Sequence, residues 1–227
     1  SLKAPMTANG IRCQVGASIG FVTSVREVCT IDSLMTDADL ALYDAKRNGR
    51  GQARAFLPSM RCQLERDRIF RIEVEAALQQ GRVTCVLQPQ VCMLTGEILG
   101  MECLGRIRSQ AGELLIPAMI LPVLTEMGRL ADFDLEVMRR CLDALMSLRA
   151  SGQDIPSVSI NASADSLRSP DYADLICEEL DARGLRSRDL VVEILESTLI
   201  ESADDAAANS IARLREAGIK TLMDDFG

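Results

Sequence analysis

The chain has 227 residues, with 25 basic and 33 acidic side chains and no histidine. Hydrophobic residues make up 48% of it, which supplies a sizeable core and excludes disorder as the main state. The net charge of −8 argues against binding a nucleic-acid polymer through its phosphates. The lack of histidine excludes Ser-His-Asp triads and zinc sites with His ligands. An enzyme of this composition must rely on carboxylates, amides, lysines or bound cations.

Eight cysteines are spread along the chain without a Cys-x-x-Cys pair, so no structural zinc site is expected. In a chain of this length without a signal peptide, we expect them to be reduced and mostly buried. No apolar stretch reaches the roughly 20 residues that cross a membrane, so we expect no membrane contact from this segment. We expect a cytoplasmic location, with any membrane anchor of the parent protein lying upstream.

The first 60 residues are predicted to hold strands, one helix and a last short strand. Apolar residues over 11–22, partly alternating with polar ones, indicate strands. Apolar residues at helical spacing predict a helix over 31–47 that ends at Asn48-Gly49, and a short strand is predicted at 56–57. One helix is too little for an independent core, so we interpret residues 1–60 as the C-terminal part of a domain.

Residues 61–80 are predicted to be a connecting segment, helical from Leu64 to Gln80 and stopped by Gly81. From residue 81 onward, apolar strand-like runs alternate with amphipathic helices, which is typical of a largely parallel α/β sheet. The predicted strands are Val83–Val91, Glu97–Arg106, Ser157–Ala162, Leu190–Ile194 and Thr221–Asp224. The predicted helices are Pro117–Met127, Asp134–Ala150, Asp171–Arg183 and Ala203–Ala217.

Two architectures fit this alternation, a doubly wound sheet and a βα barrel. A complete eight-stranded barrel takes about 250 residues, or roughly 31 per unit. The residues from 61 to the end leave room for roughly five or six such units. If the fold is a barrel, it is therefore an incomplete one.

Four predicted strands carry an oxygen-donor side chain in or just after an apolar run. The donors are Glu102, Asn161, Glu193 and the pair Asp224-Asp225. Both architectures bring the carboxyl ends of parallel strands to one face, where these groups can converge. Burying unpaired carboxylates is costly, so the set favours a bound cation, and oxygen donors alone favour Mg²⁺ or Mn²⁺ over zinc. Taken singly, each residue is an ordinary helix cap, turn former or ion-pair partner.

The segment Glu102-Cys103-Leu104-Gly105-Arg106 resembles the EAL motif of cyclic di-GMP phosphodiesterase domains. The resemblance extends in order and spacing over residues 64–227. It includes Leu87-Gln88-Pro89, Thr95-Gly96, Ile116-Pro117, Leu121-Pro122, Ser159-Ile160-Asn161, Val192 to Ser197 and Met223 to Gly227. That family folds as a TIM-like βα barrel. The resemblance therefore implies an incomplete βα barrel of the EAL type over 81–227, truncated before the last strands.

The resemblance also implies roles for individual residues. Its metal ligands match Glu102, Asn161, Glu193, Asp224 and Asp225, the last of which serves a second metal. Of these, the two aspartates and Glu102 are the catalytic candidates. Gln88 and Arg106 match positions that contact the dinucleotide, and Glu196 matches a glutamate that stabilises the loop after the Asp-Asp strand. The implied reaction is hydrolysis of cyclic di-GMP to linear pGpG with Mg²⁺ or Mn²⁺.

Three departures from the family pattern bear on activity. Leu195 stands where the family favours Thr, and Thr125 falls near a usual Glu, so loop order and substrate contacts are open to change. The sequence ends at Gly227, before a catalytic Lys and a later Glu of the family, so we expect no turnover from these 227 residues alone. For the parent protein, an active phosphodiesterase is the leading hypothesis, and a homodimer through the EAL domain is a candidate assembly. The alternatives are a catalytically silent EAL receptor for cyclic di-GMP and a diguanylate cyclase with a regulatory EAL half.

Residues 17–20 and 38–51 resemble the C-terminal third of a GGDEF diguanylate cyclase domain. Lys46 and Arg50 match that family's triphosphate contacts, and two cations one helical turn apart suit a phosphate. Taken alone, such a basic helix end is ordinary compensation of the helix dipole. The two resemblances together predict a tandem GGDEF–EAL signalling protein, with the EAL domain beginning after the connecting segment.

Overall fold

The computed structural model describes residues 5–8, 11–23, 30–195 and 205–224. The chain divides into two compact units, Ser1–Phe70 and Arg71–Gly227, and each is described by itself. The long helix α2 (Pro58–Gln79) contributes residues to both.

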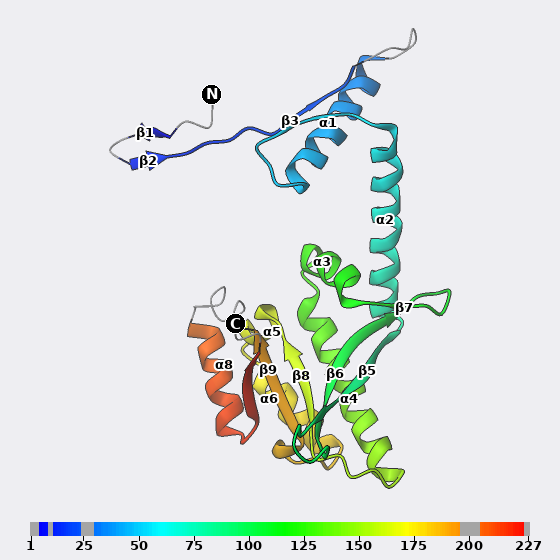
Figure 1. The fold of residues 1–227 in the computed structure, drawn as a ribbon, viewed down its shortest axis with the longest axis vertical. Coiled ribbons are helices and arrows are strands. Elements are labelled where there is room, and N and C mark those ends of the chain that lie inside the picture. The colour runs from blue at the N-terminus through cyan, green and yellow to red at the C-terminus, as the bar shows by residue number, and fades with distance from the viewer. Residues whose placement is uncertain (1–4, 9–10, 24–29, 196–204, 225–227) are drawn as a thin grey trace. The chain divides into compact units, whose positions relative to one another are not determined.

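The first unit is built around helix α1 (Ile31–Arg47), whose bounds match the predicted helix (Figure 1). Thr30 begins the helix by accepting the backbone N–H of Ser33 on its side-chain oxygen at 3.2 Å. The buried face of α1 packs on two short parallel strands, β3 and β4. The short strands of this unit are β1 (Met6–Ala8), β2 (Ile11–Cys13), β3 (Ile19–Phe21) and β4 (Ala53–Ala55). The last strand therefore precedes the predicted position at 56–57.

Strand β3 approaches α1 so closely that only glycine fits at one position. A Cβ on Gly20 would lie 2.1 Å from the backbone nitrogen of Leu42 and 2.2 Å from the carbonyl oxygen of Ala38. The backbones of the strand and the helix are therefore in direct contact at this glycine.

Helix α2 begins before the predicted start at Leu64 and is joined to each unit by arginine–carboxylate pairs. In the first unit, Arg61 donates from Nε to Oδ1 of Asp37 at 2.8 Å. In the second unit, Glu73 accepts from Nη1 of Arg82 at 2.8 Å and from the backbone N–H of Gln110 at 2.7 Å. The hydrogen bond from Arg82 is the main cause of the lowered pKa of Glu73.

The second unit contains a sheet with the strand order β10-β9-β8-β6-β5, and β7 pairs with β6 outside that path. Its strands are β5 (Val83–Val91), β6 (Ile98–Arg108), β7 (Leu114–Leu115), β8 (Val158–Ala162), β9 (Leu190–Leu195) and β10 (Lys220–Asp224). Strands β6, β8, β9 and β10 run parallel to one another, as predicted. Strand β5 is antiparallel to β6, so the sheet is largely parallel, as predicted, and not wholly so. The connection over 92–97 is far shorter than the dozen or more residues that a parallel crossover needs.

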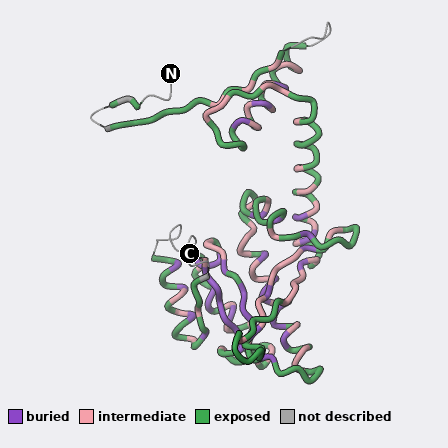
Figure 2. Tube along the Cα trace, viewed as in Figure 1, coloured by how far each residue is buried: buried purple, intermediate pink, exposed green. Residues whose placement is uncertain are grey.

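Helices pack against this sheet and supply much of its core. They are α3 (Pro117–Met127), α4 (Leu130–Ala150), α5 (Ala164–Arg168), α6 (Tyr172–Ala182) and α8 (Asp205–Glu216), and a 3-10 turn η1 covers Ser187–Asp189. Helix α4 buries Val137, Met138, Cys141, Leu142 and Leu145 and contacts β5, β6 and β8. Figure 2 shows buried residues along the central strands and on the helix surfaces that face them. None of the described helices has the length and apolar character that crossing a membrane requires.

Gly105 marks the closest approach of β6 to α4. A Cβ at this position would lie 2.7 Å from Cζ of Phe133 and 2.7 Å from Cγ2 of Val137, both of which are buried side chains. We therefore expect Gly105→Ala to lower the free energy of unfolding by about 1–3 kcal/mol, measured by urea denaturation. The penalty should shrink in a Phe133→Leu background, which leaves room for the methyl group. An equal penalty in both backgrounds would contradict this packing.

Candidate metal and dinucleotide site

The strand register places three of the predicted donors on one face of the sheet. Glu102 on β6 pairs with Ser159 on β8, and Asn161 on β8 pairs with Glu193 on β9. Paired residues of neighbouring strands point to the same side, and so do residues two apart along a strand. Glu102, Asn161 and Glu193 therefore share a face, and it is opposite to the face that carries Cys103 against α4.

Two of these predicted metal ligands, Asn161 and Glu102, form a hydrogen bond with each other. Nδ2 of Asn161 donates to Oε1 of Glu102 at 3.3 Å, between neighbouring parallel strands. Glu102 is partly exposed and Asn161 is exposed, so both remain accessible from the site face. The structure thus brings together a carboxylate and an amide side chain that the sequence separates by more than fifty positions.

Asp224 ends β10 on the same face. Leu222 pairs with Glu193 across β10 and β9, and Asp224 lies two residues beyond Leu222. The side chain of Asp224 is not described. Asp225 and Glu196, the other two predicted site residues of this region, lie outside the described residues.

Glu193 is a buried carboxylate, with a relative exposure of 5%. Its Oε1 accepts a hydrogen bond from Nε2 of Gln90 on β5 at 3.2 Å. Sequence reasoning missed Gln90, although one signal was present: it lies two residues after Gln88, so the alternation of a strand places both on one face. The strand order puts β6 and β8 between Gln90 and Glu193, so the sheet must curve for this contact to form.

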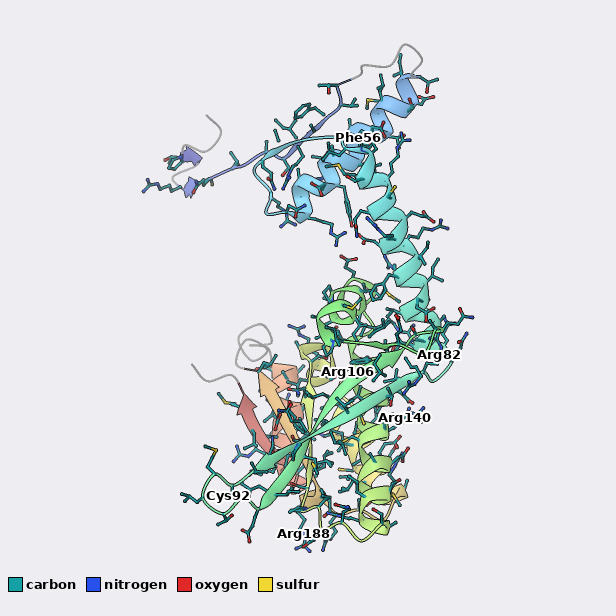
Figure 3. All side chains as sticks on the ribbon, turned by 45° about the vertical axis from the view of Figure 1, so that its right-hand side comes forward. Phe56, Arg82, Cys92, Arg106, Arg140 and Arg188 are labelled. Carbon is teal, nitrogen blue, oxygen red and sulfur yellow. The ribbon has the colours of Figure 1, made fainter. Side chains whose placement is uncertain are left out.

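The two predicted dinucleotide contacts also lie on the site face. Gln88 on β5 pairs directly with Glu102 and is exposed. Arg106 lies four residues beyond Glu102 on β6, about 13 Å further along the strand at roughly 3.3 Å per residue. Figure 3 labels Arg106 on the sheet, where its Nη1 donates to the carbonyl oxygen of Gly105 at 2.8 Å.

A partly buried aspartate fixes the turn that follows Asn161. Oδ2 of Asp134 on α4 accepts from the backbone N–H of Ser163 at 2.9 Å and from Oγ of Ser166 at 2.6 Å. Burial raises the pKa of Asp134, and the hydrogen bonds from Ser163 and Ser166 oppose that rise. Ser163 also caps α5 by accepting the N–H of Ser166 at 3.2 Å. The end of β8 that carries Asn161 is therefore anchored to α4.

The donor chemistry of this face fits a hard divalent cation. Glu102, Asn161 and Glu193 offer carboxylate and amide oxygens, the ligands that Mg²⁺ and Mn²⁺ prefer. Among the described residues no group of three or more His, Cys, Asp or Glu side chains stands ready to hold a metal, and the side chains of Asp224 and Asp225 are not among those described. Between the donors, Ser159 is 3% exposed and its Oγ has no hydrogen-bond partner in the described part of the chain. A buried hydroxyl without a partner on the donor face is consistent with a water or ligand oxygen completing the site.

In the first unit, the two predicted phosphate contacts are both exposed. Lys46 lies in the last turn of α1, but Arg50 follows the helix with a left-handed φ of 55°. The expectation that these cations stand one helical turn apart was therefore wrong, because α1 ends at Arg47.

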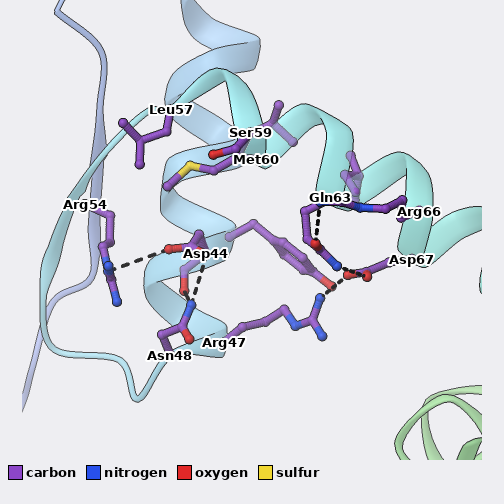
Figure 4. Close-up of a pocket in the computed structure, with 13 residues that line it drawn as sticks. Asp44, Arg47, Asn48, Arg54, Leu57, Ser59, Met60, Gln63, Arg66 and Asp67 are labelled. Carbon is purple, nitrogen blue, oxygen red and sulfur yellow. Dashed lines mark hydrogen bonds and ion pairs between the residues drawn. The ribbon is translucent and has the colours of Figure 1, made fainter. Parts of the chain in front are cut away.

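Neither cation lines the pocket of this unit, a space of about 550 Å³ between α1 and the start of α2 (Figure 4). Two ion pairs occupy its walls. Arg47 contacts Asp67 at 2.5 Å, and Arg54 contacts Asp44 at 3.6 Å. These arginine charges are already compensated by carboxylates of the wall.

All seven cysteines that the structure describes are free thiols, in agreement with a reduced state. Of these seven described cysteines only Cys103 and Cys141 are buried, so the expectation of mostly buried cysteines was wrong for them. The pKa of the Cys103 thiol is raised, chiefly by its hydrogen bond with Cys141 and also by burial, which keeps it protonated beside Glu102.

Comparison with known proteins assigns both units. Residues 71–227 match the EAL domain family, and residues 1–52 match the diguanylate cyclase GGDEF domain family. The chain therefore belongs to the EAL domain family, and its EAL domain is preceded by a fragment of a GGDEF domain.

The relatives and the solved structures agree with this family. An uncharacterized signalling protein of Caulobacter vibrioides is 30% identical over 227 residues, which are 100% of this chain and 27% of that protein. Cyclic di-GMP phosphodiesterase NbdA of Pseudomonas aeruginosa is 27% identical over 100% of this chain and 29% of its own length. The chain thus spans less than a third of these relatives. The structure of the PaMucR phosphodiesterase in complex with c-di-GMP superposes with a TM-score of 0.62 at 24% identity, over 68% of this chain and 62% of that one.

The fold of the second unit is thus that of EAL domains, a TIM-like βα barrel, as predicted. In the described residues the sheet stays open, with β5 and β10 at the two ends of its strand order.

Proposed function

We propose that the protein containing this chain hydrolyses cyclic di-GMP to linear pGpG in a reaction that depends on Mg²⁺ or Mn²⁺. The observation that carries the proposal is the meeting of Glu102 and Asn161 at 3.3 Å on the face that also holds Glu193. Membership of the EAL family and the likeness to NbdA, a cyclic di-GMP phosphodiesterase by name, support the substrate.

Each residue predicted for the EAL site has a task in this reaction. Glu102, Asn161, Glu193 and Asp224 would hold the first metal, and Asp225 would serve a second. Such cations, when bound, neutralise phosphate charge and make water a better nucleophile at neutral pH. Arg106 binds a phosphate of the dinucleotide, and Gln88, directly opposite Glu102, orients it. Glu196 supports the loop that follows the two aspartates.

In a chain with a net charge of −8, bound cations that reverse the local sign would favour an anionic substrate. The site face supplies carboxylates at Glu102 and Glu193, and Arg106 on β6 adds a cation to it. Binding of a dinucleotide with two phosphates is therefore expected to be coupled to metal binding, and a silent receptor would not need this coupling.

Removal of metal tests the proposal. We expect the full-length protein to convert cyclic di-GMP to pGpG with Mn²⁺ present, and we expect a chelator to lower the rate at least about 100-fold. Added Mn²⁺ should restore the rate, followed by chromatography of the product. Binding of cyclic di-GMP by calorimetry without product, in the presence and absence of Mn²⁺, would instead identify a receptor and overturn the proposal.

A further inference from the structure

We propose that Gln90 is a positioning residue for this site, which holds the carboxylate of Glu193 in the orientation that the metal requires. The inference rests on the proposed function. Its basis is the hydrogen bond from Nε2 of Gln90 to Oε1 of Glu193 at 3.2 Å. Among the described residues, Gln90 is the side chain that donates to this buried carboxylate.

The contact is long-range and specific to the curved sheet. Gln90 lies on β5 and Glu193 on β9, with β6 and β8 between them in the strand order. The side chain of Gln90 therefore reaches across the site face instead of contacting a neighbouring strand. A residue that joins the end strand of the sheet to a predicted metal ligand fixes the width of the site as well as the orientation of the ligand.

Gly100 leaves the space through which Gln90 reaches. The two residues are paired across the β5–β6 hairpin, and a Cβ on Gly100 would lie 3.4 Å from Oε1 of Gln90. The same Cβ would lie 3.2 Å from the carbonyl oxygen of Ser157 on the other side. Because Gly100 has no side chain, the amide of Gln90 can lie next to the backbone of Gly100 while its N–H donates to Glu193.

The chemistry of an amide suits this position better than that of a cation. Glu193 is 5% exposed, so its carboxylate needs a donor. A lysine or arginine would supply one, but its charge would neutralise Glu193 and repel a divalent metal. Glutamine donates one hydrogen bond without adding charge, which orients one oxygen and leaves the carboxylate its full attraction for a cation.

The test compares Gln90→Met with the wild-type full-length protein. Methionine keeps the length and flexibility of the side chain but cannot donate. We expect Mn²⁺ to bind at least about tenfold more weakly by calorimetry, the range found when the partner of a metal ligand is lost. The electron paramagnetic resonance spectrum of bound Mn²⁺ should also change, and kcat should fall more than KM rises. Gln90→Arg should bind Mn²⁺ more weakly still, because it adds a repelling charge.

Gln153→Met, at an exposed position in the turn before β8, is the matched control and should bind Mn²⁺ as the wild type does. If Gln90→Met binds Mn²⁺ with unchanged affinity and spectrum while the wild type turns over, Gln90 has no positioning role and the inference fails alone. If the wild type itself neither binds Mn²⁺ nor hydrolyses cyclic di-GMP, the proposed function fails and the inference falls with it. Circular dichroism of the metal-free variants confirms that each is folded, and Gln90→Asn, whose amide is too short to reach Glu193, should repeat the loss.

Discussion

Replacing Glu102 by glutamine is expected to lower kcat/KM for cyclic di-GMP roughly 10³-fold, because several kcal/mol of metal-based transition-state stabilisation depend on its charge. The substitution preserves the size of the side chain. It also preserves an oxygen that can accept from Nδ2 of Asn161, the contact seen at 3.3 Å. We therefore expect the fall in kcat/KM to come from the missing charge of the ligand and not from a change in the fold.

Glu97→Gln is a suitable control for Glu102→Gln. Glu97 is exposed in the connection between β5 and β6, on the same hairpin as Glu102, and it accepts a hydrogen bond from the hydroxyl of Thr95 in that connection at 3.1 Å. We expect wild-type kcat/KM for this control, and wild-type urea unfolding curves for both variants. If the Glu102 variant retained more than about a tenth of the wild-type rate, its role as a metal ligand would be wrong.

Elements whose boundaries are marked by local chemistry were predicted well. Helix α1 begins after its cap Thr30 and ends at Arg47, before its cap Asn48, and β5 has the predicted bounds Val83–Val91. The antiparallel direction of β5, the exception in a sheet predicted to be largely parallel, follows from the short connection over 92–97. Helix α5 was missed because a five-residue helix, Ala164–Arg168, has too few turns to show a period.

In the candidate site, too, some residues could be predicted from local features of the sequence and others could not. Glu102, Asn161 and Glu193 are visible in sequence because each is a polar residue in an apolar strand, and parallel neighbours bring them to one face. Gln90 follows no such rule, since its partner lies more than a hundred residues away and the contact depends on the curvature of the sheet. The spacing of Arg50 from Lys46 predicted one helical turn, but Arg50 follows α1 in a left-handed conformation. Its position is therefore determined by a turn and not by the helix.

A buried aspartate between two arginines supports the amino-terminal ends of β8 and β9, opposite to the ends that carry Asn161 and Glu193. Asp189 is 2% exposed and accepts from Nη2 of Arg149 at 3.0 Å and from the backbone N–H of Arg186 at 2.8 Å. Arg149, at the end of α4, also donates from Nη2 to the carbonyl oxygen of Ile155 at 2.9 Å. This cluster therefore joins α4, the segment before β8 and the start of β9.

Asp189→Asn is expected to lower the free energy of unfolding by about 3 kcal/mol at pH 7, because it removes one partner of a buried charged cluster. The matched control is Asp154→Asn, an exposed aspartate in the turn that leads to β8, which should change stability by less than about 0.5 kcal/mol. Urea denaturation of both variants measures the difference. If Asp189→Asn lowered the free energy of unfolding as little as Asp154→Asn does, the carboxylate of Asp189 would not be required to stabilise the two arginines.

The stability difference between wild type and Asp189→Asn, measured as a function of pH, gives the sign of the contribution that the charge of Asp189 makes to stability. Burial alone would raise the pKa of Asp189, but hydrogen bonds from Arg186 and Arg149 outweigh it and hold the pKa at about 2, against an ordinary 3.8. A lowered folded-state pKa contributes stability above the unfolded value, here about 2 kcal/mol at neutral pH, and that contribution is lost as the pH falls from about 4 towards 2. The stability difference between wild type and Asp189→Asn should therefore be constant from pH 7 to about 5 and narrow below pH 4. A difference that stays constant down to pH 2 would mean that Asp189 contributes through packing and not through its charge.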